Sequence, residues 1–74
     1  MTHTVLAELV ANVLSVAVAP GDRVAAGDTL VLLESMKMEI PVLAEFDGTV
    51  VEVTVQVGDV IHEGDTIAVI GSPG

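Results

Sequence analysis

Cysteine is absent from this sequence of 74 residues, so neither a disulfide nor a thiolate metal site can brace the fold. Aromatic residues are nearly absent too, because Phe46 is the only one, which excludes a base-stacking platform or an aromatic-lined pocket. Stability must therefore come from packing Val, Ile and Leu, and the chain is too short for a second core. We expect one domain over residues 1–74, with its core between residues 5 and 71.

Basic residues are scarce, since only Arg23 and Lys37 stand against eleven Asp and Glu, for a formal charge of −9. Such a chain would repel nucleic acid. No apolar stretch reaches the roughly 20 residues that a membrane helix needs, and no basic residue before Val5 or uninterrupted apolar run around Glu8 supports an export signal. We expect a cytoplasmic protein without a nucleic-acid or membrane partner.

An internal repeat is the most informative feature of what remains. Residues 13–33 align with residues 50–70 at an offset of 37, and four Gly-Asp pairs, at 21, 27, 58 and 64, fall in register. We interpret these pairs as turns, because Gly accepts positive φ and Asp bonds neighbouring amides. A phosphate cradle is disfavoured because no helix pattern follows and Asp opposes an anion.

Period-two alternation predicts strands. In the second copy, alternate residues are valine at 51, 53, 55 and 57, which is typical of a strand with one buried face, and 14, 16 and 18 match them in the first copy. Residues 5–14 also fit an amphipathic helix, but the repeat favours strands. Two similar halves predict an all-β fold, a flattened β-sandwich or barrel of two sheets with approximate two-fold symmetry.

The segment between the two copies, residues 34–39, carries the chemistry. It reads Glu-Ser-Met-Lys-Met-Glu between apolar runs, which predicts a hairpin with Lys37 at its tip, apart from the two termini. Lys37 is the only lysine, and its amine can be acylated. Met36 and Met38 are unusual at a loop tip, although either could instead fold back as core filler.

This pattern resembles the biotinyl domains of biotin carboxyl carrier proteins and biotin-dependent carboxylases, over about residues 5–71. The family motif is Ala-Met-Lys-Met on a hairpin between two quasi-equivalent halves, and Ser35, Met36, Lys37 and Met38 match it at three of four positions. The resemblance implies a barrel-sandwich hybrid of two four-stranded antiparallel sheets. It also implies covalent biotin on Lys37, with Met36 and Met38 shaping recognition.

Two departures from the family pattern carry expectations. Ser35 replaces the usual Ala, a small change that should be tolerated. Residues 8–11 replace a Pro-Met-Pro-Gly-like turn, so Ala11, which aligns with Gly48, would be strained if that turn needs positive φ and Asn12 does not supply it. No inserted thumb is present, so the chain looks more like the domains of acyl-CoA and pyruvate carboxylases, or a small stand-alone biotinylated protein.

The resemblance implies a carrier subunit without a catalytic centre of its own. Its expected partners are a biotin protein ligase, a biotin carboxylase and a carboxyltransferase, with an acyl-CoA carboxylase as the expected setting. Two alternatives stay open. The related lipoyl domains share the fold but usually place their lysine next to Asp, and a non-catalytic β interaction module could use the Met-Lys-Met tip for contact alone.

No other residues predict a site. His3 and His62 are too few and too far apart in sequence for a zinc site, so we expect no metal. Ser15, Ser35 and Ser72 lack a nucleophile-elbow context. The carboxylates fall mainly at turns, without a cleft for paired acid and base work.

Overall fold

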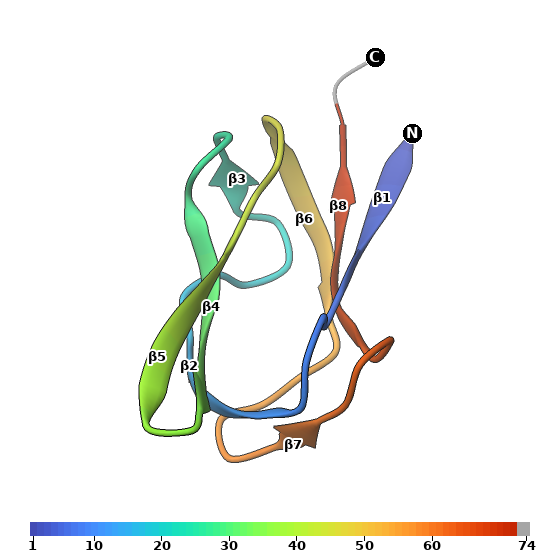
Figure 1. Ribbon diagram of the computed structural model, residues 1–74. Helices are drawn as coiled ribbons and strands as arrows, with labels where there is room; N and C mark the ends of the chain where they lie inside the picture. Colours follow the sequence, from blue (N-terminus) through green and yellow to red (C-terminus); the bar gives the residue numbers. More distant parts are fainter. Residues whose placement is uncertain (73–74) are drawn as a thin grey trace.

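The computed structural model describes residues 1–72 and contains only strands and turns there (Figure 1). No helix long and apolar enough to cross a membrane occurs among these residues. Eight strands follow one another along the chain: β1 (Thr2–Leu6), β2 (Ala11–Val16), β3 (Arg23–Val24), β4 (Thr29–Ser35), β5 (Met38–Leu43), β6 (Gly48–Val53), β7 (Val60–Ile61) and β8 (Thr66–Gly71).

The strands form two four-stranded antiparallel sheets, in the orders β1-β8-β6-β3 and β5-β4-β2-β7. The sheets face each other across an aliphatic core whose most buried side chains include Leu30, Leu33, Ile67 and Ile70. Neither sheet has two apolar faces, so each covers the inner face of the other. The all-β fold of two packed four-stranded sheets, predicted from the repeat and the family resemblance, is confirmed.

The repeat is a structural symmetry that exchanges the two sheets. An offset of 37 residues relates β2, β3 and β4 to β6, β7 and β8. The same offset relates β1 to β5, although these strands lie outside the sequence repeat of residues 13–33 and 50–70. The two sheet orders then correspond strand by strand. Strands β1 and β5 show the same alternation of exposed and half-buried residues, so residues 1–10 form strand and loop rather than helix.

The four Gly-Asp pairs form four equivalent turns. Each glycine has a φ between 90° and 96°, and each Asp amide donates to the carbonyl three residues earlier, which defines type II turns. Each Asp carboxylate in turn accepts a hydrogen bond from the amide of that same earlier residue, at 2.8 to 2.9 Å. The interpretation of these pairs as turns is confirmed, and the carboxylates are occupied with the backbone.

The prediction that the valines at 51, 53, 55 and 57 share one buried face is partly wrong. A β-bulge between Val50 and Glu52 reverses which face each residue points to, so Val50 is buried while Val51 is 53% exposed. Val53 and Val55 do point inward, but Val57 lies in a turn and is 66% exposed. A bulge at the equivalent place in β2 likewise leaves Leu14 at the surface. The periodicity of the sequence does not reveal a β-bulge, in which one extra residue reverses the alternation.

The expected strain at Ala11 is absent. Ala11 is a buried strand residue, and the described non-glycine residues with positive φ do not include it. Gly48, its equivalent, does not need positive φ either. A Cβ there would lie 2.5 Å from the carbonyl oxygen of Gly71 and 2.8 Å from a methyl group of Ile70. Close approach of β8, rather than a special dihedral angle, therefore explains this glycine.

Candidate functional site

Strands β4 and β5 form the predicted hairpin, and its loop consists of Met36 and Lys37 alone. Ser35 pairs with Met38 to close the loop, and Glu34 pairs with Glu39 below it. Both loop residues have positive φ, 53° for Met36 and 63° for Lys37, which is the geometry of a type I′ turn. Such a turn matches the twist of the strands, and it directs Lys37 away from the end of the sheet.

The loop is strained by its own sequence. Type I′ turns favour Asn and Gly, whereas a residue with a long side chain loses about 1–2 kcal/mol in the left-handed region. Met36 and Lys37 are the only non-glycine residues with positive φ between residues 1 and 72. Backbone strain of this kind gathers at functional sites, where the surrounding structure holds it in place. The strain therefore singles out the same two residues as the sequence motif.

The methionines on both sides of Lys37 do not pack into the core. Met36 is 91% exposed and Met38 is 63% exposed, so the interpretation of either as core filler is wrong. Lys37 is also exposed, and none of the residues described pairs with its ammonium group in an ion pair. The hairpin thus presents a free primary amine between two apolar side chains in solvent.

The hairpin is tied to the rest of the domain at its base. The Ser35 hydroxyl donates a hydrogen bond of 3.0 Å to the carbonyl oxygen of Val10, in the connection before β2. Below that point β4 also pairs with β2, with Asn12 opposite Glu34. Because β4 is held on both sides and β5 on one, the tip rests on a rigid support. No sequence pattern indicated the Ser35 contact, since Val10 is 25 residues away along the chain.

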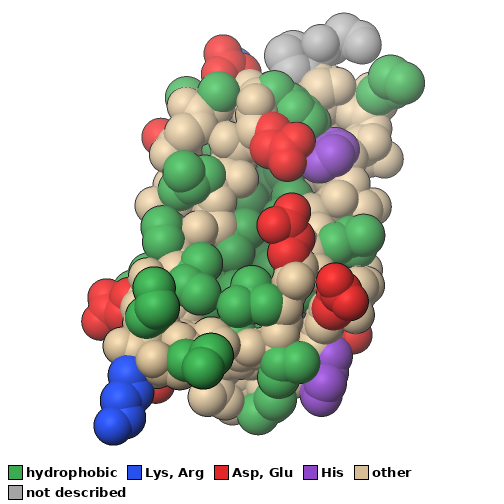
Figure 2. Space-filling model, in the orientation of Figure 1, with side chains coloured by type: hydrophobic (Ala, Val, Ile, Leu, Met, Phe, Trp, Pro, Cys, Tyr) green, Lys and Arg blue, Asp and Glu red, His purple; other side chains and the backbone are tan. Residues whose placement is uncertain are grey.

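The hairpin tip lies at the opposite end of the molecule from the N-terminus and the end of β8 (Figure 1). The domain is elongated, with extents of 38 × 18 × 17 Å, and the tip occupies one end of the long axis. In Figure 2 a basic side chain projects into solvent at the corner where the β4–β5 turn lies. A group attached at this tip would be free of steric hindrance from the N-terminus and from the end of β8, as predicted from the symmetry, whereas the C-terminus itself lies outside the described residues.

The other candidate residues remain separate. His3 lies against Glu45, at 4.0 Å, and packs edge-on against Phe46, whereas His62 lies 3.8 Å from Asp65 within its own turn. No cluster of three metal-ligating side chains occurs in residues 1–72. The third serine of interest, Ser72, bonds the carbonyl oxygen of Met1, and Ser15 is exposed on β2.

The chemistry available at the hairpin is acylation of an amine. A lysine without a salt bridge, on a stem that reaches beyond the backbone, can form an amide with an activated carboxylic acid. The residues present therefore fit a covalently attached acyl cofactor such as biotin.

Comparison with known proteins identifies the family and its cofactor. Residues 2–70 match the family described as biotin-requiring enzyme. A biotinylated protein TB7.3 homolog from Mycolicibacterium smegmatis is 67% identical over 42 residues, which cover 57% of this chain and 59% of that protein. The matched region thus spans about three fifths of this relative's length.

Solved structures show the same fold in larger proteins. A single-chain, multi-domain long-chain acyl-CoA carboxylase contains a region with a TM-score of 0.91 and 33% identity, covering 99% of this chain and 7% of that one. A lipoyl domain of the 2-oxoglutarate dehydrogenase complex from Azotobacter vinelandii aligns with a TM-score of 0.76 and 28% identity, covering 88% of this chain and 82% of that one. The chain belongs to the biotin-requiring enzyme family, as a carrier domain whose cofactor is covalently attached biotin.

Proposed function

We propose that Lys37 is the biotin attachment site and that the domain carries a carboxyl group between two active sites of a biotin-dependent carboxylase. The observation that carries this proposal is the geometry of the hairpin. The chain's single lysine stands exposed at the tip of a strained two-residue turn, flanked by exposed methionines, at the end of the domain remote from the N-terminus.

Attachment would be an amide-forming step catalysed by a biotin protein ligase. The Lys37 Nζ, after losing a proton, attacks the carbonyl carbon of an activated biotin, the C–N bond forms, and the activating group leaves. The positive charge of the side chain is lost, so the formal charge of the chain moves from −9 to −10. Met36 and Met38 present an apolar surface on each side of the amine that a ligase can bind.

Once attached, biotin supplies a ring nitrogen that accepts and releases a carboxyl group. The domain contributes position: the β4–β5 hairpin holds the Lys37 stem at a rigid end, and the stem provides reach. A tethered cofactor samples a small volume around each active site, which raises its effective concentration there. The partners in this proposal are a biotin carboxylase and a carboxyltransferase, and the chain has no catalytic centre of its own.

An acyl-CoA is the acceptor that we propose. The fold matches a region of a long-chain acyl-CoA carboxylase over nearly the whole of this chain. We also propose a cytoplasmic location, which the absence of cysteine fits. The related lipoyl domain has the same fold, so a lipoyl cargo is the outcome that a test must be able to detect.

The test is intact mass together with avidin binding after production in cells with an active biotin ligase. Wild type is expected to gain one biotinyl increment, and Lys37→Arg is expected to gain none. A matched control exchanges the two basic residues, Lys37→Arg with Arg23→Lys, which keeps one exposed lysine and the same charge. It should also stay unmodified, because Arg23 lies in β3 rather than on the hairpin.

The other outcomes are equally informative. An unmodified wild-type chain would overturn the proposal in favour of an interaction module, and a lipoyl increment would assign a different cargo. Modification of the exchanged variant at residue 23 would show that lysine exposure, and not the hairpin, directs the ligase.

A further inference from the structure

A groove separates the free edges of the two sheets on one side of the molecule. Strands β1 and β5 are edge strands of different sheets and do not pair with each other. The groove between them has a volume of about 790 Å³. Figure 2 shows it as an apolar hollow bordered by carboxylates. The residues lining it do not include 36–38, so it is distinct from the biotin attachment site.

The bed of the groove is apolar and partly exposed. Val5 and Val42 are half-buried in it, while Leu6 and Leu43 are 48% and 45% exposed. These are two pairs of residues related by the offset of 37, so both edges contribute alike. Leucines exposed to this extent at matching positions on two facing edges give a surface that another chain could cover. The outer edges of β1 and β5 also carry backbone groups with no strand partner.

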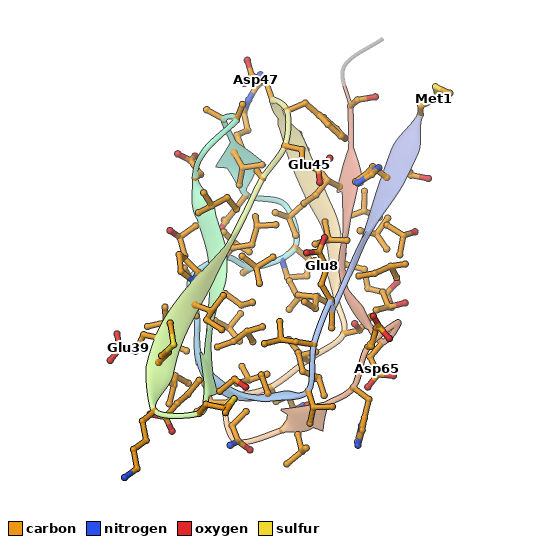
Figure 3. The ribbon with its side chains drawn as sticks, in the orientation of Figure 1. Met1, Glu8, Glu39, Glu45, Asp47 and Asp65 are labelled. Atoms are coloured by element: carbon orange, nitrogen blue, oxygen red, sulfur yellow. The ribbon has the colours of Figure 1, made fainter. Side chains whose placement is uncertain are left out.

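The rim of the groove is acidic. Glu8 and Glu45, again related by the offset of 37, project over the gap between β5 and β1 (Figure 3), and Glu63 completes the rim. Neither Arg23 nor Lys37 lines the groove, and the one imidazole in its lining, that of His3, lies 4.0 Å from Glu45. A low-dielectric bed beneath three carboxylates concentrates negative potential there.

The charge distribution selects among possible occupants. A second copy of the chain would bring its own glutamates against Glu8 and Glu45, and each copy has a charge of −9. A basic segment would instead neutralise the rim. An extended segment also suits the free edges, because strand addition satisfies backbone groups while alternate side chains enter the bed.

We propose that the groove between β1 and β5 binds an extended segment of a partner protein that combines aliphatic side chains with lysine or arginine. Docking there leaves the hairpin end uncovered, so a partner can hold the domain while Lys37 stays accessible. This inference goes beyond the proposed carrier function and does not depend on it, because the unmodified chain has the same groove.

The test is an NMR titration of the unmodified, isotope-labelled protein with a seven-residue peptide of alternating valine and lysine, blocked at both ends. We expect amide shift changes concentrated in β1 and β5. A peptide with glutamate in place of lysine and one with glycine in place of valine should each bind at least about tenfold more weakly, because one loses the charge attraction and the other the apolar contact.

The six glutamates of the chain supply a matched pair of variants. One replaces the groove glutamates, Glu8→Gln, Glu45→Gln and Glu63→Gln, and the other replaces the remaining three, Glu34→Gln, Glu39→Gln and Glu52→Gln. Both variants lose three negative charges, so the formal charge changes from −9 to −6. We expect about tenfold weaker peptide binding for the groove variant only.

Several results would overturn the proposal. Equal weakening in both variants would show diffuse attraction to an acidic protein, and shift changes outside β1 and β5 would place binding elsewhere. Absence of shift changes would show that the groove does not bind such a segment. Concentration-dependent dimerisation in sedimentation, with shifts in β1 and β5 and no peptide present, would assign the groove to a second copy. The state of Lys37 is measured separately by mass, so this test can fail while the carrier proposal stands.

Discussion

At the scale of single residues, two small residues determine how the hairpin is attached to the domain and how closely β6 and β8 pack. The Ser35 hydroxyl ties the base of the hairpin to Val10. Gly48 lets β8 approach β6 more closely than any other residue would allow. Neither role could be recognised from sequence, because each depends on a contact between segments more than 20 residues apart.

Replacing the hydroxyl at residue 35 should loosen the hairpin. For Ser35→Ala we expect the free energy of unfolding to fall by about 0.5–1.5 kcal/mol, the net contribution of one hydrogen bond. We also expect faster amide hydrogen exchange at residues 36–38. The control is Ser72→Ala, which removes the equivalent hydroxyl at the far end, where it bonds Met1. Hydrogen exchange measured by NMR on both variants decides the point. Equal exchange at the hairpin in the two variants would contradict a positioning role for Ser35.

Adding a methyl group at residue 48 should be costly. Gly48→Ala would place a Cβ 2.5 Å from the carbonyl oxygen of Gly71. We expect this overpacking to lower the free energy of unfolding by about 1–3 kcal/mol. Gly71→Ala is the control, because its nearest contact would be a valine methyl at 3.3 Å. Urea denaturation of both variants measures the difference. A smaller loss for Gly48→Ala than for Gly71→Ala would refute this explanation of the glycine.

At the scale of elements, the turns divide into relaxed and strained ones. Four type II turns place glycine at the positive φ and let the following Asp bond the backbone, so sequence and geometry agree. The β4–β5 hairpin does the opposite, because it places Met36 and Lys37 where Asn and Gly are preferred. Conflict between local preference and structure is expected where function selects the residues.

Relief of that conflict should stabilise the domain. Met36→Asn is expected to raise the free energy of unfolding by about 0.5–1 kcal/mol, because Asn tolerates the left-handed region. The control is Met38→Asn, which changes the neighbouring methionine, 63% exposed, at an ordinary strand position. Thermal unfolding followed by circular dichroism compares the two. Stabilisation by both substitutions, or by neither, would show that φ strain at residue 36 does not limit stability.

At the scale of the whole molecule, symmetry and charge act together. The two-fold relation puts the hairpin at the opposite end from the N-terminus and the end of β8, and it pairs equivalent side chains across the β1–β5 groove. The charge of −9 on 74 residues repels itself in the folded state. The five Asp carboxylates accept hydrogen bonds from backbone amides, which offsets part of this repulsion.

Screening this repulsion should stabilise the fold. Between about 20 mM and about 500 mM sodium chloride the Debye length falls severalfold, so we expect Tm to rise by a few degrees. The variant with glutamine at 34, 39 and 52, whose charge is −6, should show a smaller rise. Calorimetry at both salt concentrations measures this. A Tm independent of salt in the wild type would show that repulsion is not a significant term.

The fold class and the four Gly-Asp turns were predictable because each depends on local chemistry that the repeat presents twice. The hairpin was predictable because its residues lie between the two copies and are flanked by apolar runs. Residues 5–14 alone fit either a helix or strands, and the similarity of the two copies favoured strands. The inward and outward faces of residues 51–57 were misread because one bulge reverses the alternation. Ala11 was misread because the glycine it replaces is required by close packing rather than by φ.

The sequence by itself determined an all-β domain of two similar halves and a lone lysine between two methionines, since composition, turn residues and repeats are properties of the chain. Tertiary structure alone decided the strain at Met36 and Lys37, the Ser35 contact to Val10, and the groove between β1 and β5 with its acidic rim. These features depend on which distant segments meet. That meeting is set by the packing of the two sheets as a whole, which no local pattern encodes.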